Sequence, residues 1–285
     1  MSLNNNYSAR QRLVKRASSV SVQIICILLG LVVMFPVIYA FLISFMEPAQ
    51  VLSREASIIP KKWTLENYAT ALRSAPLMRF MWNSLVISLV STVIRVLVSA
   101  LAAFAFAFFD FKGKNFLFLM VLGTFMIPGD VVLIGNYQTA ADLGLINTYT
   151  GMMMIFLVSG MNIFMLRQSF KTFASDIRDA AYIDGCGNFR FFWSVLLPTN
   201  ISSLLTVSIT GFMGTWNTYL WPLLVTNKPN MRTIQVGITM MNFSEGTVHG
   251  PIMAASIIVL VPALLLFLIF QKQIKAGMMA GGVKG

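Results

Sequence analysis

The chain contains a series of apolar runs that are each long enough to cross a lipid bilayer. A helical span needs roughly 20 apolar residues, because a helix rises about 1.5 Å per residue through a hydrocarbon layer about 30 Å thick. The runs lack the period-two alternation of barrel strands, so we predict an all-α, polytopic membrane bundle of six transmembrane helices. The six runs cover residues 22–45, 85–109, 115–134, 149–166, 201–225 and 251–270.

The composition agrees with a membrane protein and argues against a soluble domain. Hydrophobic residues make up 57% of the sequence and charged residues 11%, against about 25% charged residues in a typical soluble domain. The net charge of +11 fits basic loops beside a membrane, because inner loops and anionic headgroups select Lys and Arg. No dense run of basic residues interleaved with aromatics is present, so we expect no nucleic-acid partner.

The distribution of Lys and Arg predicts the topology. The first apolar run is longer than the 7 to 15 residues of a signal-peptide core and lacks a cleavage site, so we predict an uncleaved helix. More basic residues fall on the inner side when the N-terminus is cytoplasmic, although the first outer loop also carries five of them. We therefore expect a cytoplasmic segment over residues 1–20, a membrane domain over 21–272 and a cytoplasmic tail over 273–285.

The sequence offers no metal or catalytic site. Its two cysteines, Cys26 and Cys186, fall in a predicted span and a predicted inner loop, where a structural disulfide is not expected. His249 is the one histidine, so the usual zinc ligands are absent, and we predict no bound metal. No paired carboxylates or Ser/His pair falls within a span, which argues against an intramembrane enzyme.

The longest inner connection, residues 167–200, has the local signals of two short helices. Ser175 is a candidate N-cap for the first helix, and Gly185 offers the left-handed conformation that ends it. Asn188 is the candidate cap of the second helix, which we expect to end before Pro198.

An aromatic cluster follows this turn, in a loop that is expected to face water. Its members are Phe189, Phe191, Phe192 and Trp193. Such an exposed apolar surface indicates either a protein partner or a position in the lipid interface, and the residues alone leave both open.

The same loop carries a spaced motif, D-A-A-x-x-D-G-C from Asp179, followed eight residues later by V-x-L-P. It resembles the EAA loop, E-A-A-x-x-x-G … I-x-L-P, of bacterial ABC importer permeases, and it falls between the fourth and fifth spans as in that family. Two positions depart from the family pattern. Asp179 stands where the family has Glu, and Cys186 stands where it usually has Ala.

The resemblance implies that this loop, residues 171–198, is a coupling helix that docks into a cytoplasmic ATPase. The implied coupling residues are Asp179, Ala180, Ala181, Asp184, Gly185 and Cys186. The tail enters the ATPase interface in such permeases, which assigns that position to Gly281, Gly282, Val283 and Lys284. The chain lacks a G-x-x-x-x-G-K-[ST] phosphate loop, so the resemblance implies that it binds no cofactor itself and that the partner ATPase binds ATP and Mg²⁺.

Motifs along most of the chain resemble the carbohydrate-uptake branch of these permeases. They are Trp63–Tyr68, Asn83-Ser84, Met126-Ile127-Pro128, Trp216-Asn217, Trp221-Pro222 and the final Ala280–Gly285. The chain is similar to the six-span permease of maltose, multiple-sugar and glycerol-3-phosphate importers, with the MetI-like fold of type I importers. This implies a subunit that imports a carbohydrate through the bacterial cytoplasmic membrane by alternating access. The implied partners are a homologous second permease, an ATPase dimer and an extracytoplasmic solute-binding protein.

Five polar or aromatic residues within the spans are candidates for the translocation pathway. Arg95 lies near the middle of the second span, where an unpaired charge costs roughly 2.5 to 3.5 kcal/mol, so it is expected to face protein or water. It either lines the pathway or caps carbonyls between helices. The other four are Trp216, Asn217, Tyr219 and Trp221, which either contact sugar rings or pack in the core and the interface.

Other functions remain open at the level of the sequence. The same complex type would import glycerol-3-phosphate or a related phosphodiester, and Arg95 is compatible with an anion. A self-contained secondary transporter would use Arg95 and Asp130 as its ion relay and would need no ATPase.

Two outer segments also carry helix signals. Thr64 is the candidate cap of a short helix over residues 65–72. The mixed apolar and polar residues of 135–148 favour a short interfacial helix.

Overall fold

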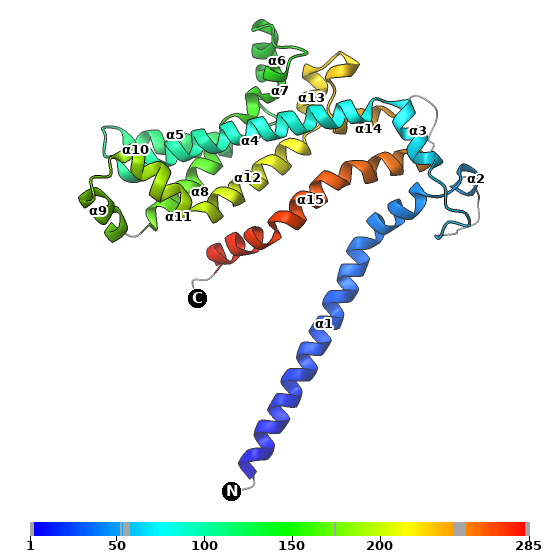
Figure 1. Cartoon of the computed structure of the whole chain (residues 1–285), viewed down its shortest axis with the longest axis horizontal. Helices are drawn as coiled ribbons and strands as arrows, with labels where there is room; N and C mark the ends of the chain where they lie inside the picture. Colours follow the sequence, from blue (N-terminus) through cyan, green and yellow to red (C-terminus); the bar gives the residue numbers. More distant parts are fainter. Residues whose placement is uncertain (1–2, 52, 54–57, 174, 242–248, 283–285) are drawn as a thin grey trace. The chain divides into compact units, whose positions relative to one another are not determined.

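The computed structural model describes residues 3–51, 53, 58–173, 175–241 and 249–282, and every regular element among them is helical (Figure 1). In chain order the elements are α1 (Leu3–Ser44), α2 (Pro48–Val51), α3 (Glu66–Ser74), α4 (Leu77–Phe108), α5 (Lys114–Met126), α6 (Leu133–Asp142), α7 (Tyr149–Met153), η1 (Met154–Phe156), α8 (Gly160–Lys171), α9 (Ser175–Ile183), α10 (Asn188–Phe191), η2 (Phe192–Leu196), α11 (Leu197–Thr199), α12 (Ile201–Trp216), α13 (Leu220–Val225), η3 (Pro229–Met231), α14 (Ile234–Met241) and α15 (His249–Gly282).

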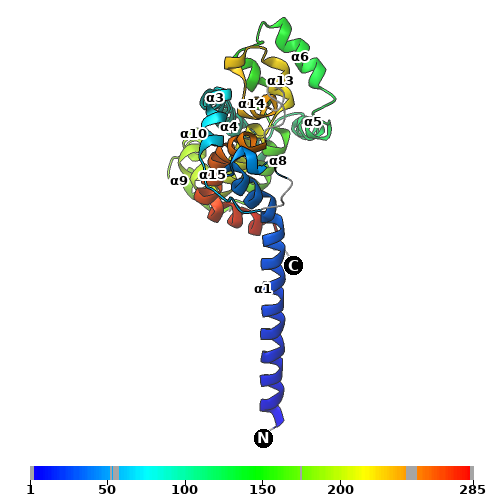
Figure 2. The same ribbon diagram turned by 90° about the vertical axis from the view of Figure 1, so that its right-hand side faces the viewer.

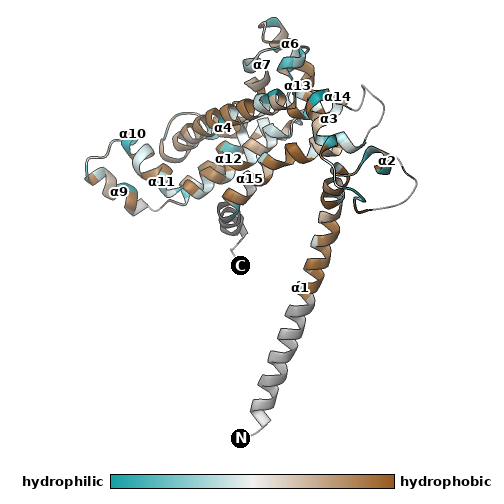
Figure 3. Ribbon diagram, turned by 45° about the vertical axis from the view of Figure 1, so that its right-hand side comes forward, coloured by the Kyte–Doolittle hydropathy of each residue, from teal (hydrophilic) through white to brown (hydrophobic). Residues whose placement is uncertain are grey.

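Three of the described helical segments are long and apolar enough to cross a membrane by themselves: Val22–Ser44, Leu77–Phe108 and His249–Gln271. Two further segments qualify when each bent pair of helices is taken as one span, which gives five. The bends measure 50° between Tyr149–Phe156 and Gly160–Lys171, and 78° between Asn188–Thr199 and Ile201–Trp216. The coloured part of α1 and most of α4 consist of hydrophobic residues (Figure 3).

The third predicted run, 115–134, is not one span. Its helix, α5, has 13 residues and ends at Met126, and a separate helix, α6, begins at Leu133. Pro128 explains the early end, because proline disfavours helical geometry in the residue before it. At about 1.5 Å per residue, α5 is too short to cross the hydrocarbon layer alone.

The second span begins earlier than predicted, at Leu77 rather than residue 85. Polar residues hid this start, because Asn83 and Ser84 do not continue an apolar run. Both are buried, and their side chains bond to protein groups rather than to water. A helix in lipid tolerates polar side chains that find partners inside the protein.

The chain divides into two compact units, the first made of Met1–Arg73 and Gly246–Ile258. In this unit α1 forms one continuous rod (Figure 2). Asn67 lies in α3 and donates to the carbonyls of Ser44 (3.1 Å), the last residue of α1, and Met46 (2.7 Å), two residues beyond it. These contacts satisfy carbonyls that a helix end leaves free. The Glu66 N–H donates to Thr64 Oγ1 at 3.1 Å, so Thr64 bonds to the first turn as predicted, although the helix begins at Glu66 and not at residue 65.

The second unit, Ser74–Glu245 and Val259–Gly285, is built along α4. Helices α8 and α12 pack against α4, and α5 packs against α8. Helices α9–α11 lie at one end of α4 and α14 lies toward the other, whereas α6 and α13 lie along the side of α4 between them (Figure 1). Two separate apolar clusters lie along α4 in this unit. The first includes Phe104, Phe170 and Phe191, and the second includes Met152 and Trp221.

Candidate functional site

The predicted coupling loop forms a capped helical turn at the end of the second unit. Gly185 has φ +77°, as the sequence predicted for the residue that ends α9. Its N–H donates to the Tyr182 carbonyl at 3.0 Å, and the Cys186 N–H donates to the Ala181 carbonyl at 2.9 Å. This pair of bonds is a Schellman motif, which satisfies the last carbonyls of the helix and fixes the direction of the following chain.

The loop residues divide into an anchored face and an exposed face. Ala181 and Cys186 pack against the apolar cluster of the second unit, whereas Ala180, Asp184 and Gly185 are exposed. Of the two alanines in the motif, Ala180 is thus open to solvent and Ala181 is half-buried. Ala181 occupies the C3 position and Cys186 the C″ position of the motif, where an apolar contact commonly accompanies the turn.

The second loop helix differs from its prediction at both ends. Gly187, not Asn188, is the N-cap of α10, and the Asn188 side chain instead accepts a hydrogen bond from the Tyr182 hydroxyl at 2.6 Å. The helical stretch runs past Pro198 to Thr199, with the π-helix η2 in the middle. Proline has no backbone N–H to donate within a helix. In the π-helix before Pro198 the backbone hydrogen bonds join residues five apart, as from the Leu197 N–H to the Phe192 carbonyl.

The four aromatic residues after the turn have different environments. Phe191 and Phe192 are buried, at 0% and 1% exposed, and pack on Phe104. Phe189 and Trp193 are 75% and 42% exposed. The aromatic cluster therefore anchors the loop with two rings and presents the other two.

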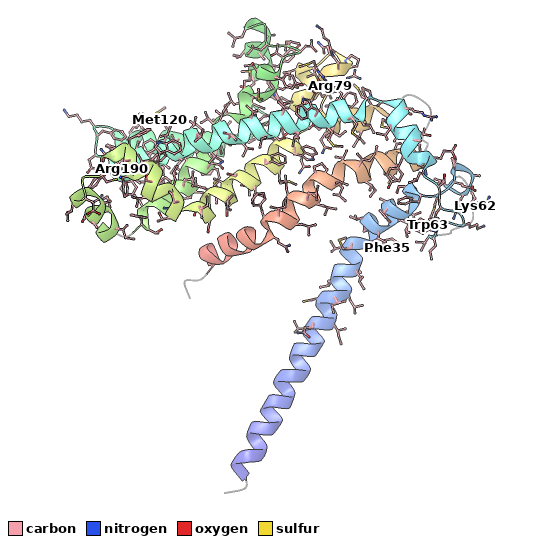
Figure 4. The ribbon with its side chains drawn as sticks, viewed as in Figure 1. Phe35, Lys62, Trp63, Arg79, Met120 and Arg190 are labelled. Atoms are coloured by element: carbon pink, nitrogen blue, oxygen red, sulfur yellow. The ribbon has the colours of Figure 1, made fainter. Side chains whose placement is uncertain are left out.

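The exposed part of the coupling loop also carries charges of both signs. Asp179 lies 3.4 Å from Arg178 Nε, and this pair is solvent-exposed. The Arg178 guanidinium lies 5.9 Å from the Phe108 ring at the end of α4. Arg190 projects at the same end of α4, opposite to the end where Arg79 lies (Figure 4). The exposed apolar side chain at the tip of α9 is Ile183, at 85%.

The second set of predicted coupling residues lies at the C-terminus. Gly281 and Gly282 are the last two residues of α15. Val283 and Lys284 lie outside the described residues.

Arg95 lies between the two apolar clusters of the second unit and is 8% exposed. Its guanidinium donates to the Phe156 carbonyl through Nε, to the Gly211 carbonyl through Nη1 at 3.2 Å, and to Thr215 Oγ1 through Nη2 at 2.9 Å. The acceptors lie in η1 and α12, so one side chain joins three segments of the bundle. This geometry is that of a carbonyl cap, one of the two environments expected for Arg95.

The other four pathway candidates do not share one surface. Trp216 and Trp221 are 2% and 1% exposed. Trp216 stacks on Phe212 with ring centroids 5.8 Å apart. Trp221 Nε1 donates to the carbonyls of Gly151 and Met152. Asn217 is exposed and Tyr219 half-buried, in the break between α12 and α13.

Residues that the sequence analysis did not single out as functional form a second polar junction. Asn83 Nδ2 donates to the carbonyls of Asn230 and Arg232, both at 2.9 Å, and the Tyr149 hydroxyl donates to Asn83 Oδ1 at 2.6 Å. The junction ties α4 to α7 and η3 at the end remote from the coupling loop. The signal available in the sequence was a polar Asn just before the predicted start of the second span.

No cluster of three or more His, Cys, Asp or Glu residues that could hold a metal ion occurs in the described part of the chain.

The sequence was compared with models of known families. Residues 7–279 match the family described as "Binding-protein-dependent transport system inner membrane component". The chain belongs to this family. It is thus a multi-pass permease component of a transport system, and the resemblance seen in the coupling loop is confirmed.

Similar permeases cover nearly the whole chain. The arabinooligosaccharides transport system permease protein of Halalkalibacterium halodurans is 33% identical, with 90% of this chain and 93% of that protein covered. The sn-glycerol-3-phosphate transport system permease protein of Brucella suis is 34% identical, with 88% and 93% covered.

A solved structure shows the same fold. A bacterial ABC transporter that imports the acidic polysaccharide alginate has a chain that superposes with a TM-score of 0.79 at 19% identity, with 91% of this permease and 97% of that chain covered. The helical permease fold of the ABC importers is therefore the fold of this chain.

Proposed function

We propose that this permease imports a carbohydrate across the bacterial cytoplasmic membrane by alternating access driven by a partner ATPase. The observation that carries the proposal is the exposed tip of the coupling loop, formed by Ala180, Ile183, Asp184, Gly185 and Phe189. Large apolar side chains exposed beside charged ones mark a protein interface. A tip that meets only water would have little reason to expose Ile183 and Phe189.

The tip is joined rigidly to the spans, which a coupling element needs. Phe191 is fully buried, and its ring contacts those of Phe108 in α4 and Phe173 after α8, at centroid distances of 5.7 and 5.8 Å. Packed interiors transmit displacement because they have few voids. Movement of the tip by a docked ATPase would therefore move α4 and the segment that follows α8.

The proposed assembly contains four kinds of component. This chain pairs with a homologous permease, docks on a cytoplasmic ATPase dimer and receives solute from an extracytoplasmic binding protein. ATP and Mg²⁺ bind to the ATPase and not to this chain. For transport, ATP must bind one state of the assembly more tightly than the other, since a ligand shifts an equilibrium only through differential affinity.

The proposed orientation places residues 1–20 and 273–285 in the cytoplasm. The coupling loop, 171–198, lies on that side, and Gly281, Gly282, Val283 and Lys284 approach the ATPase. The excess of Lys and Arg on these segments supports this orientation.

The proposed solute is a carbohydrate. The arabinooligosaccharide and alginate systems named above transport carbohydrates. The contacts of Arg95 favour a neutral solute over glycerol-3-phosphate. Its guanidinium already donates to three protein acceptors, so it is not held in place to bind an anion. Asn217 and Tyr219, in the break after α12, are the proposed pathway contacts, and Trp216 and Trp221 support them from the core.

The test is co-purification of the tagged permease with its ATPase. Gly185→Val forces a branched side chain into a left-handed backbone at the tip, and we expect it to abolish co-purification. Gly144→Val is the matched control, because Gly144 also has positive φ (65°) and also has open space around its Cβ. Gly144 lies between α6 and α7, away from α9–α11 and the coupling loop (Figure 1). Equal loss in both variants, or in neither, would contradict docking at the tip.

Transport assays separate this mechanism from a secondary transporter. Uptake in proteoliposomes should require the ATPase, ATP and the binding protein, and should persist when ion gradients are collapsed. Uphill uptake by the purified chain with an ion gradient alone would refute the proposal.

A further inference from the structure

A cavity of about 400 Å³ opens beside α5 in the second unit. It lies at the end of α4, the start of α5 and the last turns of α8. Its lining residues are Asp110, Phe111, Gly113, Lys114, Asn115, Phe116, Arg167 and Lys171. Three of these side chains are cationic and one is anionic, so the cavity carries a net positive charge.

Arg167 is the buried cation of this cavity, at 8% exposed. Its Nε donates to the Phe106 carbonyl at 3.2 Å, and its guanidinium carbon lies 3.9 Å from the centre of the Phe118 ring. These contacts fix the plane of the guanidinium. Its two terminal amino groups make no hydrogen bond to any residue that the structure describes, which leaves their four N–H donors for a ligand.

The other cations differ in their availability. Lys114 donates to the Phe109 carbonyl and to Asp110, so it is committed to the end of α4. Lys171 is exposed and lies one helical turn after Arg167 on the same face of α8. Like charges at this spacing repel each other, and an anion bound between them would remove the repulsion.

The N-terminus of α5 adds further donors at the same place. Gly113 is its N-cap with φ +82°, and no side chain caps the helix. The first backbone N–H groups of a helix carry partial positive charge and bind anions. Because α5 has 13 residues, its aligned peptide dipoles place a partial positive charge at this N-terminus.

An apolar surface on α5 adjoins these donors. Phe116, Leu119 and Met120 are 64%, 65% and 56% exposed, and Met120 projects outward from α5 (Figure 4). A phosphate in the cavity with an acyl chain along α5 would use both surfaces. This combination favours a lipid over a free anion.

We propose that the cavity binds the phosphodiester headgroup of an anionic membrane lipid, with Arg167 and Lys171 as its ligands and the acyl chains on α5. Guanidinium groups form short, charge-assisted bonds with phosphate oxygens. Basic pockets between membrane helices hold anionic headgroups in this way. Placing the lipid in the inner leaflet rests on the proposed topology, but binding itself does not.

The test uses the full chain, purified in detergent and delipidated, with lipid binding followed by native mass spectrometry. The dissociation constant of phosphatidylglycerol should be at least about fivefold lower than that of phosphatidylcholine. Inorganic phosphate at the same concentration should not displace bound phosphatidylglycerol. Arg167→Gln should weaken phosphatidylglycerol binding about tenfold, and Lys171→Gln about fivefold. Because Lys171 is exposed, its variant changes the charge without disturbing the core.

Arg190→Gln is the matched control, because Arg190 is an exposed cation at the same end of α4 but does not line the cavity. Its affinity for phosphatidylglycerol should stay within about twofold of the native value. Equal losses in the Lys171 and Arg190 variants, or no loss in the Lys171 variant, would overturn the site. Displacement by inorganic phosphate would overturn its assignment to lipid. The measurement needs neither ATPase nor solute, so its failure is distinct from failure of the transport proposal.

Discussion

Arg95 Nη2 donates a hydrogen bond to Thr215 Oγ1 at 2.9 Å, across the contact between α4 and α12. The same guanidinium lies against Gly211, where an added Cβ would be 3.0 Å from Nη1. The absent side chain at Gly211 therefore makes the space that lets the charge reach its acceptors. A cation in the bundle is accommodated by carbonyls and a hydroxyl, with no carboxylate among its hydrogen-bond partners in the part of the chain that the structure describes.

Replacing Arg95 by Gln should destabilise the bundle by about 2 kcal/mol, because Gln is shorter and leaves acceptors without donors. Thr215→Val should cost about 0.6 kcal/mol, since it removes one of these contacts. Unfolding of each variant in mixed micelles measures the difference. Unchanged stability with lost solute uptake would assign Arg95 to the pathway instead.

Variants of Phe191 and Phe189 should distinguish a side chain that anchors the coupling loop from one that contacts the ATPase. Phe191→Ala should lower the free energy of unfolding by about 3 to 5 kcal/mol, because a fully buried ring leaves a cavity. Phe189→Ala should change stability by less than about 0.5 kcal/mol but weaken ATPase co-purification, because this ring is exposed. Thermal unfolding and co-purification of both variants check this, and a Phe189 variant that retains full ATPase binding would remove its ring from the interface.

Trp221 and Trp216 are equally buried but differ in hydrogen bonding. Trp221→Phe removes the donor to the Gly151 and Met152 carbonyls, at 3.1 and 3.2 Å. We expect it to cost about 1 to 2 kcal/mol more than Trp216→Phe, for which the described residues provide no hydrogen-bond partner. Equal melting temperatures in detergent would show that these bonds contribute nothing to stability.

Gly160 marks the close approach of α8 to α5. A Cβ at Gly160 would lie 2.6 Å from the Val121 carbonyl oxygen and 2.6 Å from Thr124 Oγ1. Because a backbone atom cannot rotate away, Gly160→Ala should cost about 1 to 3 kcal/mol. Gly214→Ala, with nothing within 4 Å of its Cβ, should stay within about 0.5 kcal/mol of the native protein. Comparable losses in unfolding free energy would contradict close packing as the cause.

The sequence predicted elements best where one residue controls the local backbone. Gly185 ends α9 in the left-handed conformation, and Thr64 bonds to the first turn of α3, as expected. Prediction from the sequence was wrong where the length of a helix depends on hydrogen-bond partners elsewhere in the chain. The start of α4 was missed because Asn83 finds acceptors near residue 230, about 150 positions away in the sequence.

Side-chain orientation in the coupling loop was the least predictable feature. The spacing of Ala180 and Ala181 does not reveal which of them meets the core, and only Ala181 does. The aromatic cluster divided in the same way, with Phe191 inside and Phe189 outside. Neighbouring helical positions point about 100° apart, so the packing of α4 and α8 decides which face is covered.

The residues alone were enough to predict that the chain crosses a membrane, that its spans are helical, and where its coupling motif lies. Those properties follow from apolar length, from the need to pair every backbone group in lipid, and from local turn chemistry. Only the packed helices show that Arg95 bonds to two carbonyls and a hydroxyl, that α5 is a short helix, and that Arg167 lines an open cavity. These outcomes depend on acceptors and surfaces that come from distant segments, and such partners exist only once the helices have packed together.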